Sequence, residues 1–579
     1  MKPYARHVSK RSTPQSQPIP GRADMVMNSA GGYVFEIDDW ARLDRFLILG
    51  SEGGTYYATE HKITVENAEC VQRCLAENHT RAIGSIVSIS ESGRAPKNDP
   101  AIFALAMAAA HDNPEIRHMA FGALPRVCRI GTHLFQFNEA LDLMRPQWNR
   151  SRRRAIAKWY NEKEGHDLAL QIVKYRNRAN WTHRDTLRLS HAKPKNERYD
   201  ALFKWATFKP ENAEGEEGLG DTLSVRTLKA ADKLVFGFEM LKAAGAAKGE
   251  HSAKSLAKIA KLITDYKLPR EAVEGVNTAF LKHPVIWEAL LADMPMTAMI
   301  RSLGAMSACE FLTIGSDAAK TIVQRLHNED RLHKARIHPI NVLSAMLTYA
   351  AGHGFRGKLT WLTVSKVVDA LDDAFYLCFK NVRATNKRRL KAIDISGSMD
   401  GNTVNGLPFL DARMASAALA LVDANVEPNV EFMGFGTKFQ ELEISPKWRL
   451  DQVCAYMGSL GMQGTDCALP MVWAAQHGFK FDSFEVWTDN ETWAGRIQPV
   501  QALQAYRKKT GIAAKSAVIG MTATECSIAD PEDGGMMDFV GLDAATPNLI
   551  ADFIGYSDEA EPSKAKRRVT VDEEIDVEA

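Results

Sequence analysis

The spacing of apolar residues along the chain changes near residue 388. From about residue 35 to 375, apolar residues recur at the spacing of amphipathic helices. Several of these stretches begin with a polar residue followed by proline, which is typical of helix starts because the first turn of a helix leaves its N–H groups unpaired. Predicted helices of this type cover residues 101–111, 115–128, 285–294 and 340–352, with Asp99 and Asn113 as caps of the first two. We expect short helices, paired and stacked in an irregular array.

Beyond residue 388 the apolar residues form short runs separated by helical stretches. The predicted strands are residues 389–395, 430–435, 483–489, 515–521 and 538–543, and helices such as 411–424 and 498–511 lie between them. Strands that alternate with helices indicate βαβ crossovers and therefore a mostly parallel, doubly wound sheet. The predicted fold class is α + α/β, a helical part followed by a sheet domain.

Length and composition add limits to this picture. A chain of 579 residues with 45% hydrophobic residues is expected to form two to four domains. No apolar run approaches the ~20 residues that cross a bilayer, so we expect no membrane association. Eight cysteines without a CxxC pair favour a reducing, cytoplasmic location and speak against structural zinc. Residues 1–30 are predicted to be a flexible basic arm, and the charged residues 558–579 a disordered tail.

A polar turn, KAIDISGSMDG (391–401), follows the first predicted strand. Asp394 ends that strand, and Ser396 and Ser398 follow at alternate positions. Ligands of open α/β sheets bind beyond the carboxyl ends of the strands, where Thr465 and Asp489 are expected in two further loops. Five oxygen-bearing side chains from three loops suit an octahedral Mg²⁺ or Mn²⁺.

Two other interpretations of this turn stay open. The three residues could form an ordinary polar turn, although Thr465 and Asp489 at the same edge favour a metal site. A bound ion could also stiffen the loops without meeting any partner. The set D-x-S-x-S, threonine, aspartate resembles the metal-ion-dependent adhesion site of von Willebrand factor A domains. That resemblance implies direct coordination by Ser396, Ser398 and Thr465, with Asp394 and Asp489 acting through waters or hydrogen bonds.

One segment of the helical part is strongly basic. Residues 152–195 contain twelve Lys and Arg against four acidic residues, whereas the net charge of the whole chain is only +1. Clustered basic residues indicate nucleic-acid binding, because contacts to phosphates dominate its affinity. The candidate RNA-binding residues are Lys174, Arg178, Arg184, Arg188 and His191. A weaker basic patch lies between residues 331 and 358.

The spacing within this segment predicts a shared face. Lys174 and Arg178 are four residues apart, which would place them one above the other on a helix. Tyr175 and Trp181 lie between the basic residues and could stack on unpaired bases. The alternative for both aromatic residues is packing in the core, which we favour for Trp181.

Longer strings of sequence resemble a known family. GGYVFEIDDWARLDRFLILGSEGG (31–54), RAIAKWYNEKEG (154–165), RLSHAKP (188–194) and KARIHP (334–339) resemble the TROVE module of the Ro ribonucleoprotein autoantigen family. QGTDCALPMVWA (463–474) and TDNETWAG (488–495) resemble the A domain of the same family. The resemblance implies a TROVE module over residues 31–380 and a von Willebrand factor A-like domain over residues 381–557.

The resemblance also implies an architecture and a function. We expect a ring of irregular HEAT-like helical repeats closed by the A domain, acting as a monomer. Lys174, Arg178 and His191 match positions that contact RNA in the family, and Arg188 and His191 would lie at the rim of the central opening. The implied ligands are Y RNA on the outer basic surface and the 3′ single-stranded ends of misfolded noncoding RNAs, with a 3′ exoribonuclease as a partner in RNA quality control.

Two classes of function remain to be separated. The chain shows no nucleophile paired with a base, and its glycine-rich GSEGGT (50–55) lacks the lysine of a phosphate-binding loop, so we expect no enzymatic activity. The alternative to an RNA-binding scaffold is a protein-interaction module whose A domain grips a carboxylate of a partner through the metal ion.

Overall fold

The structure is a computed structural model. It describes residues 12–27, 31–36, 39–49, 68–92, 98–208, 224–246, 252–354, 358–399, 404, 409–436, 438–460, 465–488, 495–520, 526–530, 533–540 and 546–557. The predicted tail over residues 558–579 and the first eleven residues lie outside this part of the chain.

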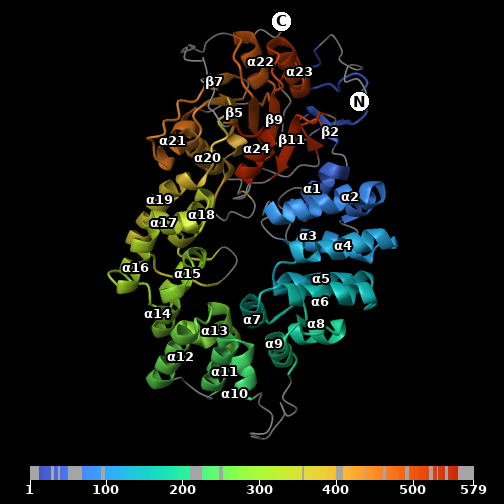
Figure 1. Cartoon of the computed structure of the whole chain (residues 1–579). Helices are drawn as coiled ribbons and strands as arrows, with labels where there is room; N and C mark the ends of the chain where they lie inside the picture. The colour runs from blue at the N-terminus through green and yellow to red at the C-terminus, as the bar shows by residue number, and fades with distance from the viewer. Residues whose placement is uncertain are drawn as a thin grey trace.

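The helices form a ring that the sheet domain closes (Figure 1). One side of the ring is built from α1 (Asp39–Leu49), α2 (Glu69–Ser92), α3 (Asp99–Ala110), α4 (Pro114–Val127), α5 (Gly131–Met144), α6 (Arg150–Glu162), α7 (Gly165–Lys174), α8 (His183–Ser190) and α9 (Glu197–Thr207). The bottom contains α10 (Val225–Ala231), α11 (Lys233–Gly245), α12 (Ala253–Tyr266), α13 (Arg270–Val276) and the 3₁₀ helix η2 (Thr278–Lys282). The other side rises through α14 (Pro284–Asp293), α15 (Met296–Ala308), α16 (Asp317–Leu326), α17 (Glu329–Lys334), α18 (Pro339–Ala350), α19 (Ser365–Leu377) and the 3₁₀ helix η3 (Cys378–Asn381).

The four helices predicted from proline-marked starts are confirmed as α3, α4, α14 and α18. At α4 the Asn113 side chain accepts a hydrogen bond from the backbone N–H of Glu115 at 2.9 Å, as a cap does. The predicted cap Asp99 is wrong, because α3 already begins at Asp99 and Asn98 precedes it. The Asn98 amide makes no cap. It donates instead to the carbonyl of Val127 at 2.9 Å, which ties the start of α3 to the end of α4.

The sheet domain is doubly wound, as predicted. Its strands are β5 (Arg389–Asp394), β6 (Val430–Phe435), β7 (Phe439–Glu441), β8 (Ser483–Thr488), β9 (Lys515–Gly520) and β11 (Met536–Val540), in the order β11-β9-β8-β5-β6-β7. All neighbouring pairs are parallel except β6 and the short edge strand β7, which the sequence did not predict. Its helices are α20 (Ala412–Val426), α21 (Leu450–Ser459), α22 (Leu469–His477), α23 (Pro499–Thr510) and α24 (Thr546–Ile554), with the 3₁₀ turn η4 (Gly397–Met399). The strand order reverses between β5 and β8, and such a reversal opens a crevice for ligands.

The N-terminal segment is bound to the sheet domain, so the prediction of a flexible basic arm over residues 1–30 is wrong for residues 12–27. Strands β1 (Met25–Met27) and β2 (Tyr33–Glu36) pair with each other, and β2 also pairs with β10 (Cys526–Ser527). Gln15 is fully buried, and its backbone N–H donates to the carbonyl of Gly495 at 2.8 Å. Arg22 forms an ion pair with Asp530 at 2.7 Å. The polar composition of this segment suggested disorder, but the side chains of Gln15 and Arg22 find partners more than 450 residues away in the sequence.

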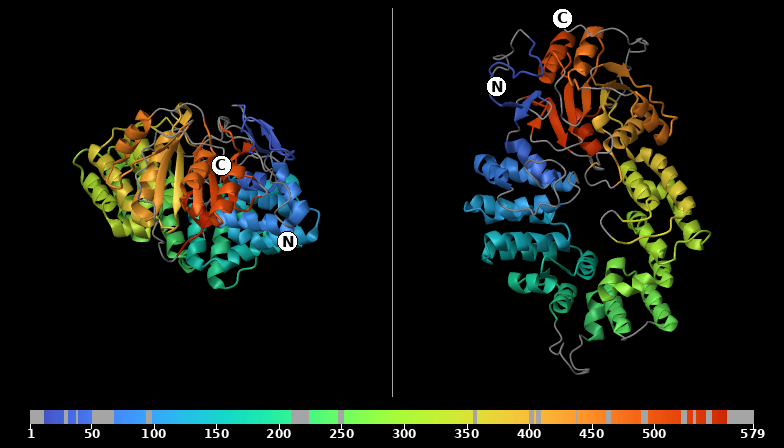
Figure 2. Two further views of the ribbon diagram at one scale, coloured as in Figure 1. Left: turned by 90° about the horizontal axis from the view of Figure 1, so that it is seen from above. Right: turned by 180° about the vertical axis from the view of Figure 1, so that it is seen from behind.

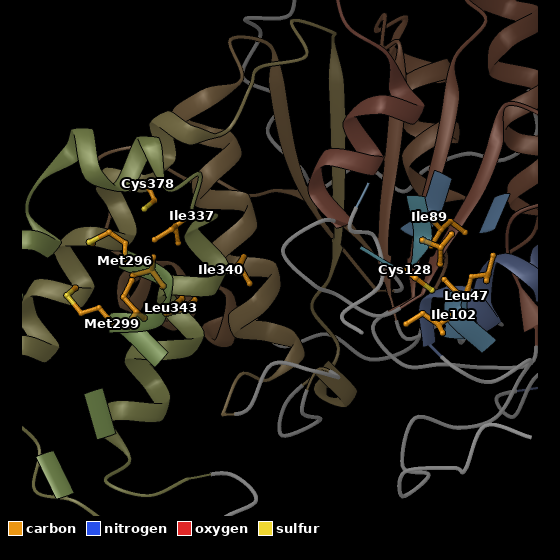
Figure 3. Packing of buried hydrophobic residues seen from close by; sticks show 14 of the residues in the cluster. Leu47, Ile89, Ile102, Cys128, Met296, Met299, Ile337, Ile340, Leu343 and Cys378 are labelled. Carbon is orange, nitrogen blue, oxygen red and sulfur yellow. The ribbon is translucent and has the colours of Figure 1, made fainter. Parts of the chain in front are cut away.

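The ring is therefore closed from both ends of the helical part. On one side β2 joins the segment before α1 to β10 of the sheet domain. On the other side α18 packs against α20, and the N–H of Leu450 donates to the hydroxyl of Tyr376 at 3.0 Å. Figure 2, seen from above, shows the sheet domain between the first helices and the last ones. Figure 3 shows core residues of both sides, with Leu47, Ile89 and Ile102 around the first helices and Met296, Met299, Ile337 and Leu343 between α15 and α18.

Two smaller points follow from the described residues. The described cysteines form no disulfide. None of the described helices has both the length and the apolar composition required to cross a bilayer.

Candidate nucleic-acid interface and metal centre

The carboxyl end of β5 presents a buried carboxylate at the point where the strand order reverses. All six residues of β5 are buried, and Asp394 at its end is 1% exposed. Asp394 Oδ1 accepts a hydrogen bond from the N–H of Ser396 at 2.8 Å, which folds the DIS segment into a turn. Asp394 Oδ2 lies 3.4 Å from the hydroxyl of Thr488, the last residue of β8. The turn after β5 and the end of β8 therefore meet at this carboxylate.

A third loop reaches the same edge of the sheet. The N–H of Asp466 donates to the carbonyl of Gly436, directly after β6, at 3.1 Å. Its neighbour Thr465 is 6% exposed, and Ser396 is 7% exposed. The carbonyl of Ser396 accepts a hydrogen bond from Arg413 of α20 at 3.3 Å, which fixes the turn against the helix. The structure thus brings Asp394, Ser396 and Thr465 to one edge.

The other two predicted ligands are only partly described. Ser398 lies in η4, but its side chain is outside the described residues, and Asp489 is outside them altogether. Among the described residues no three His, Cys, Asp or Glu side chains gather to hold an ion. An ion at this edge would therefore depend on hydroxyl, carboxylate and water oxygens, the donor set of a hard cation such as Mg²⁺ or Mn²⁺. The buried carboxylate and hydroxyls fit that chemistry.

Sequence reasoning missed Asp466, which joins this edge to the N-terminal segment. Its carboxylate accepts hydrogen bonds from the side chain of Gln15 at 2.6 Å and from the N–H of Ala468 at 3.0 Å. Burial raises the pKa of Asp466 to about 6. The bond to Ala468 is a local turn that the TDCA sequence could have indicated. No local signal identifies Gln15 as its partner.

The basic segment does not form the continuous helical face that its spacing predicted. Helix α7 ends at Lys174, and Arg178 lies in a two-residue strand, β3 (Asn177–Arg178), paired with β4 (Trp181–Thr182). Ala179 and Asn180 between these strands both have left-handed backbones, with φ of 53° and 58°. Two successive residues of this kind form the tight turn that joins antiparallel strands. The prediction that Lys174 and Arg178 share a helix face is therefore wrong.

The hairpin and the next helix nevertheless present cations to the surface. Thr182 and Asp185 form a capping box that starts α8. Arg178, Arg188 and His191 are exposed, and His191 ends α8 with a left-handed backbone, φ 50°. In the described part of the chain the side chains of Arg178 and Arg188 contact no carboxylate. Arg184 is half-buried, and its Nε donates to the carbonyl of Thr207 at 3.2 Å.

Lys174 is more constrained than these residues. Its ammonium lies 3.3 Å from the carboxylate of Glu271 on α13 and over the ring of Tyr175. Burial lowers the pKa of Lys174, but Glu271 and Tyr175 together outweigh burial and hold that pKa above its ordinary value. This ion pair connects α7 with the bottom of the ring.

Several other cations of the basic segment make contacts within the protein. Fewer of them are therefore available to a ligand than the number of Lys and Arg residues in the sequence predicted. Arg152 is 1% exposed, pairs with Asp142 and lies 4.0 Å from the ring of Trp148. Lys163 and Lys195 each donate to a backbone carbonyl.

Tyr175 and Trp181, the two aromatic residues of the basic segment considered for base stacking, are both half-buried. Trp181 packs against Trp148, with ring centroids 5.8 Å apart, in line with the favoured core role. The Cβ of Tyr175 packs near Gly131 at the start of α5, where any added side chain would collide with it and with His183. We assign neither ring to base stacking.

The fold places the chain in the class of proteins in which an A-type sheet domain closes a ring of helices. Comparisons with known proteins identify the family. A family model of the TROVE domain matches residues 26–348, and one of the Ro60 vWA domain matches residues 388–554. The RNA-binding protein RO60 of Deinococcus radiodurans is 38% identical over 555 residues, covering 96% of this chain and 99% of that protein. The protein of the same name from Caenorhabditis elegans is 34% identical over 582 residues, covering 91% and 90%. The chain belongs to the TROVE-domain family of Ro60 proteins.

A solved structure agrees with this assignment. The crystal structure of the Deinococcus radiodurans RO (RSR) protein matches with a TM-score of 0.72 at 37% identity, covering 89% of this chain and 99% of that one. The fold class predicted from the sequence is therefore confirmed.

Proposed function

We propose that the chain is an RNA-binding scaffold without catalytic activity. The observation that carries this proposal is the exposed group of Arg178, Arg188 and His191 on the hairpin and α8, in which neither guanidinium pairs with a carboxylate of the described residues. Surface cations that are not paired with a carboxylate bind phosphates, and the family membership reported above supports RNA as the source of those phosphates. Arg184 of α8 would add to its positive potential, whereas the charge of Lys174 is compensated by Glu271.

In this proposal the surface around α8 holds a structured RNA such as a Y RNA, and the ring receives the single-stranded 3′ end of a misfolded noncoding RNA. A protein that binds helical RNA contacts mainly the phosphate backbone and the shallow minor groove. Such binding requires a surface of cations rather than a helix inserted into a groove to recognise bases. The scaffold would serve RNA quality control in the cytoplasm, as a monomer and together with a 3′ exoribonuclease that supplies the cleavage.

The test compares two RNAs that differ only in the blocked end. Each carries a stem and a single-stranded tail, and a bulky hairpin closes either the 3′ or the 5′ terminus. The proposal expects the 3′ hairpin to weaken binding and the 5′ hairpin to leave it unchanged. Equal affinities for both RNAs would contradict entry of the 3′ end and leave only a basic surface.

A second candidate function belongs to the edge of the sheet. The gathering of Asp394, Ser396 and Thr465 at the reversal point favours a divalent cation, Mg²⁺ or Mn²⁺, with Ser398 and Asp489 completing the set. Such an ion would offer an open position to a carboxylate of a protein partner. Chelation should then abolish binding of that partner and leave RNA binding intact, whereas loss of RNA binding on chelation would assign the ion to the RNA site.

A further inference from the structure

A cavity of about 550 Å³ lies between α13, α15, α18 and the segment that follows α18. The volume is in the range of sites that enclose a small organic ligand. The cavity is separate from the surface around α8 and from the carboxyl edge of β5.

The cavity is strongly cationic. Arg270, Arg301 and Arg336 line it, and no aspartate or glutamate does. Arg301 and Arg336 are exposed, and within the described residues neither side chain meets a carboxylate. Arg270 lies 3.5 Å from Glu274, but its buried Nε has no hydrogen-bond partner in the described chain. Among the described residues Glu274 is the one carboxylate within ion-pair distance of these three guanidinium groups, and such an excess of positive charge favours an anion.

An aromatic wall stands beside these cations. Trp361 lines the cavity, and its indole N–H donates to the carbonyl of Tyr349 at 2.9 Å while its backbone N–H donates to Gly352 at 2.9 Å. Gly304 of α15 permits this placement, because a Cβ there would lie 2.8 Å from the indole ring. The ring is therefore held in place before any ligand arrives, and a fixed ring costs little entropy when a base stacks on it.

Polar groups complete the lining. Asn341, Ser344 and Thr348 follow each other at helical spacing on the face of α18 that borders the cavity. The hydroxyl of Thr348 donates to the carbonyl of Ser344 at 2.8 Å, whereas Asn341 is exposed. An exposed amide can both donate to and accept from the edge of a base.

We propose that this cavity binds one unpaired nucleotide, with the phosphate on Arg301 and Arg336 and the base against Trp361. The ligand class is a phosphorylated nucleoside, because an inorganic anion would use the arginines but not the aromatic wall. Two sources share this chemistry, a free mononucleotide and a residue of single-stranded RNA, and the second source rests on the proposed RNA-binding function.

The test measures binding to the full chain by calorimetry, with AMP and a single-stranded adenylate tetranucleotide as probes. The variant Arg301→Ala with Arg336→Ala removes two exposed cations, so it should keep the fold. Its matched control, Lys334→Ala with Lys366→Ala, removes two exposed cations of the same side of the ring that do not line the cavity. We expect the cavity variant to lose about tenfold or more in affinity for whichever probe binds, and the control to change by less than about twofold.

A second variant tests the aromatic wall. Gly304→Val should displace Trp361 and lower the affinity for the tetranucleotide, while the affinity for inorganic phosphate stays unchanged. Comparable competition by a glutamate peptide would make the cavity a general anion site and overturn the assignment to nucleotides. Tighter binding of AMP than of the tetranucleotide would identify a free nucleotide as the ligand, and the reverse would identify an RNA strand.

The outcome is separable from that of the proposed function. If a structured RNA binds the wild-type chain but the cavity variant keeps full affinity for both probes, only the cavity proposal fails. If no RNA binds while AMP binds and depends on Arg301 and Arg336, the RNA function fails and the cavity remains as a nucleotide site.

Discussion

Replacing Arg389 with methionine should destabilise the sheet domain, because Arg389 is the centre of a buried ionic network below the candidate metal edge. It is the first residue of β5 and is 4% exposed. Its guanidinium donates to Glu485 at 2.7 Å, to Glu427 at 2.7 Å and to Asp423 at 3.1 Å. Lys391 is the second cation of the network and also contacts Asp423.

The size of the expected decrease in the free energy of unfolding follows from the carboxylates that the substitution leaves without their arginine partner. Arg389→Met leaves three buried or nearly buried carboxylates with Lys391 as their cation. Removing one partner of a buried ion pair costs about 3–5 kcal/mol, since the remaining charge stays desolvated. For a domain of this size that loss corresponds to a decrease in melting temperature of roughly 6–20 °C.

The loss of folding stability in the Arg389→Met variant should depend on pH. Burial raises the pKa of Asp423, but Arg389 and Lys391 outweigh burial and hold that pKa below its ordinary value. A carboxylate with a lowered pKa stabilises the folded state above its unfolded pKa and loses this contribution as the pH falls. The variant lacks much of this contribution, so the gap between wild type and variant should be fully present above about pH 4 and narrow as the pH falls below that value.

Hydrogen exchange measured by mass spectrometry can localise this effect in the whole chain. Peptides that cover β5 and β8 should lose protection in the variant, and peptides from α2–α4 should serve as an unchanged internal control. Arg389→Met combined with Glu485→Gln should recover part of the loss, because one unpaired carboxylate is removed. A loss below about 1 kcal/mol at pH 7, or one that does not narrow as the pH falls below about 4, would refute the reasoning.

Two further predictions concern a buried histidine and the metal edge. Burial lowers the pKa of His183 to about 4, and its Nδ1 lies 2.7 Å from the hydroxyl of Tyr160. Because folding favours the neutral ring, the contribution of His183 to the free energy of unfolding should be fully present above pH 6.5. That free energy should fall by about 3 kcal/mol as the pH decreases toward 4. The variant His183→Gln should therefore show a shallower pH dependence of its melting temperature. Ser396→Ala with Thr465→Ala should abolish binding of Mg²⁺ or Mn²⁺ in calorimetry while RNA binding persists, and unchanged metal affinity would contradict the coordination by these hydroxyls.

Much of the fold was predictable because its signals are local. The strands of the sheet domain are short apolar runs between helical stretches, and β6 spans the same residues that its apolar run predicted. The proline-marked helices were predictable because proline is favoured in the first turn of a helix. Asp394 could be placed at the carboxyl end of a central strand from the same pattern, since the end of a buried run is visible in the sequence.

The remainder depends on contacts that no local pattern encodes. Spacing alone placed Lys174 and Arg178 on one helix, but α7 ends at Lys174, and the left-handed turn at Ala179 and Asn180 makes Arg178 part of a hairpin. A count of charges treated Arg152 as part of a surface, although Asp142 and Trp148 enclose it. The burial of Gln15 requires partners from the opposite end of the chain, and such contacts exist only once the ring has closed.

The salt dependence of RNA binding tests the central claim most directly. Arg178→Ala with Arg188→Ala is preferable to a variant at Lys174, since Lys174 also holds Glu271. The control Lys158→Ala with Lys204→Ala removes two exposed lysines that are already paired with acids. If the surface around α8 binds phosphates, the affinity for a structured RNA should fall steeply with salt, and the log–log slope should decrease by roughly 2 in the first variant and little in the control. An unchanged affinity and slope in the Arg178 and Arg188 variant would contradict the account.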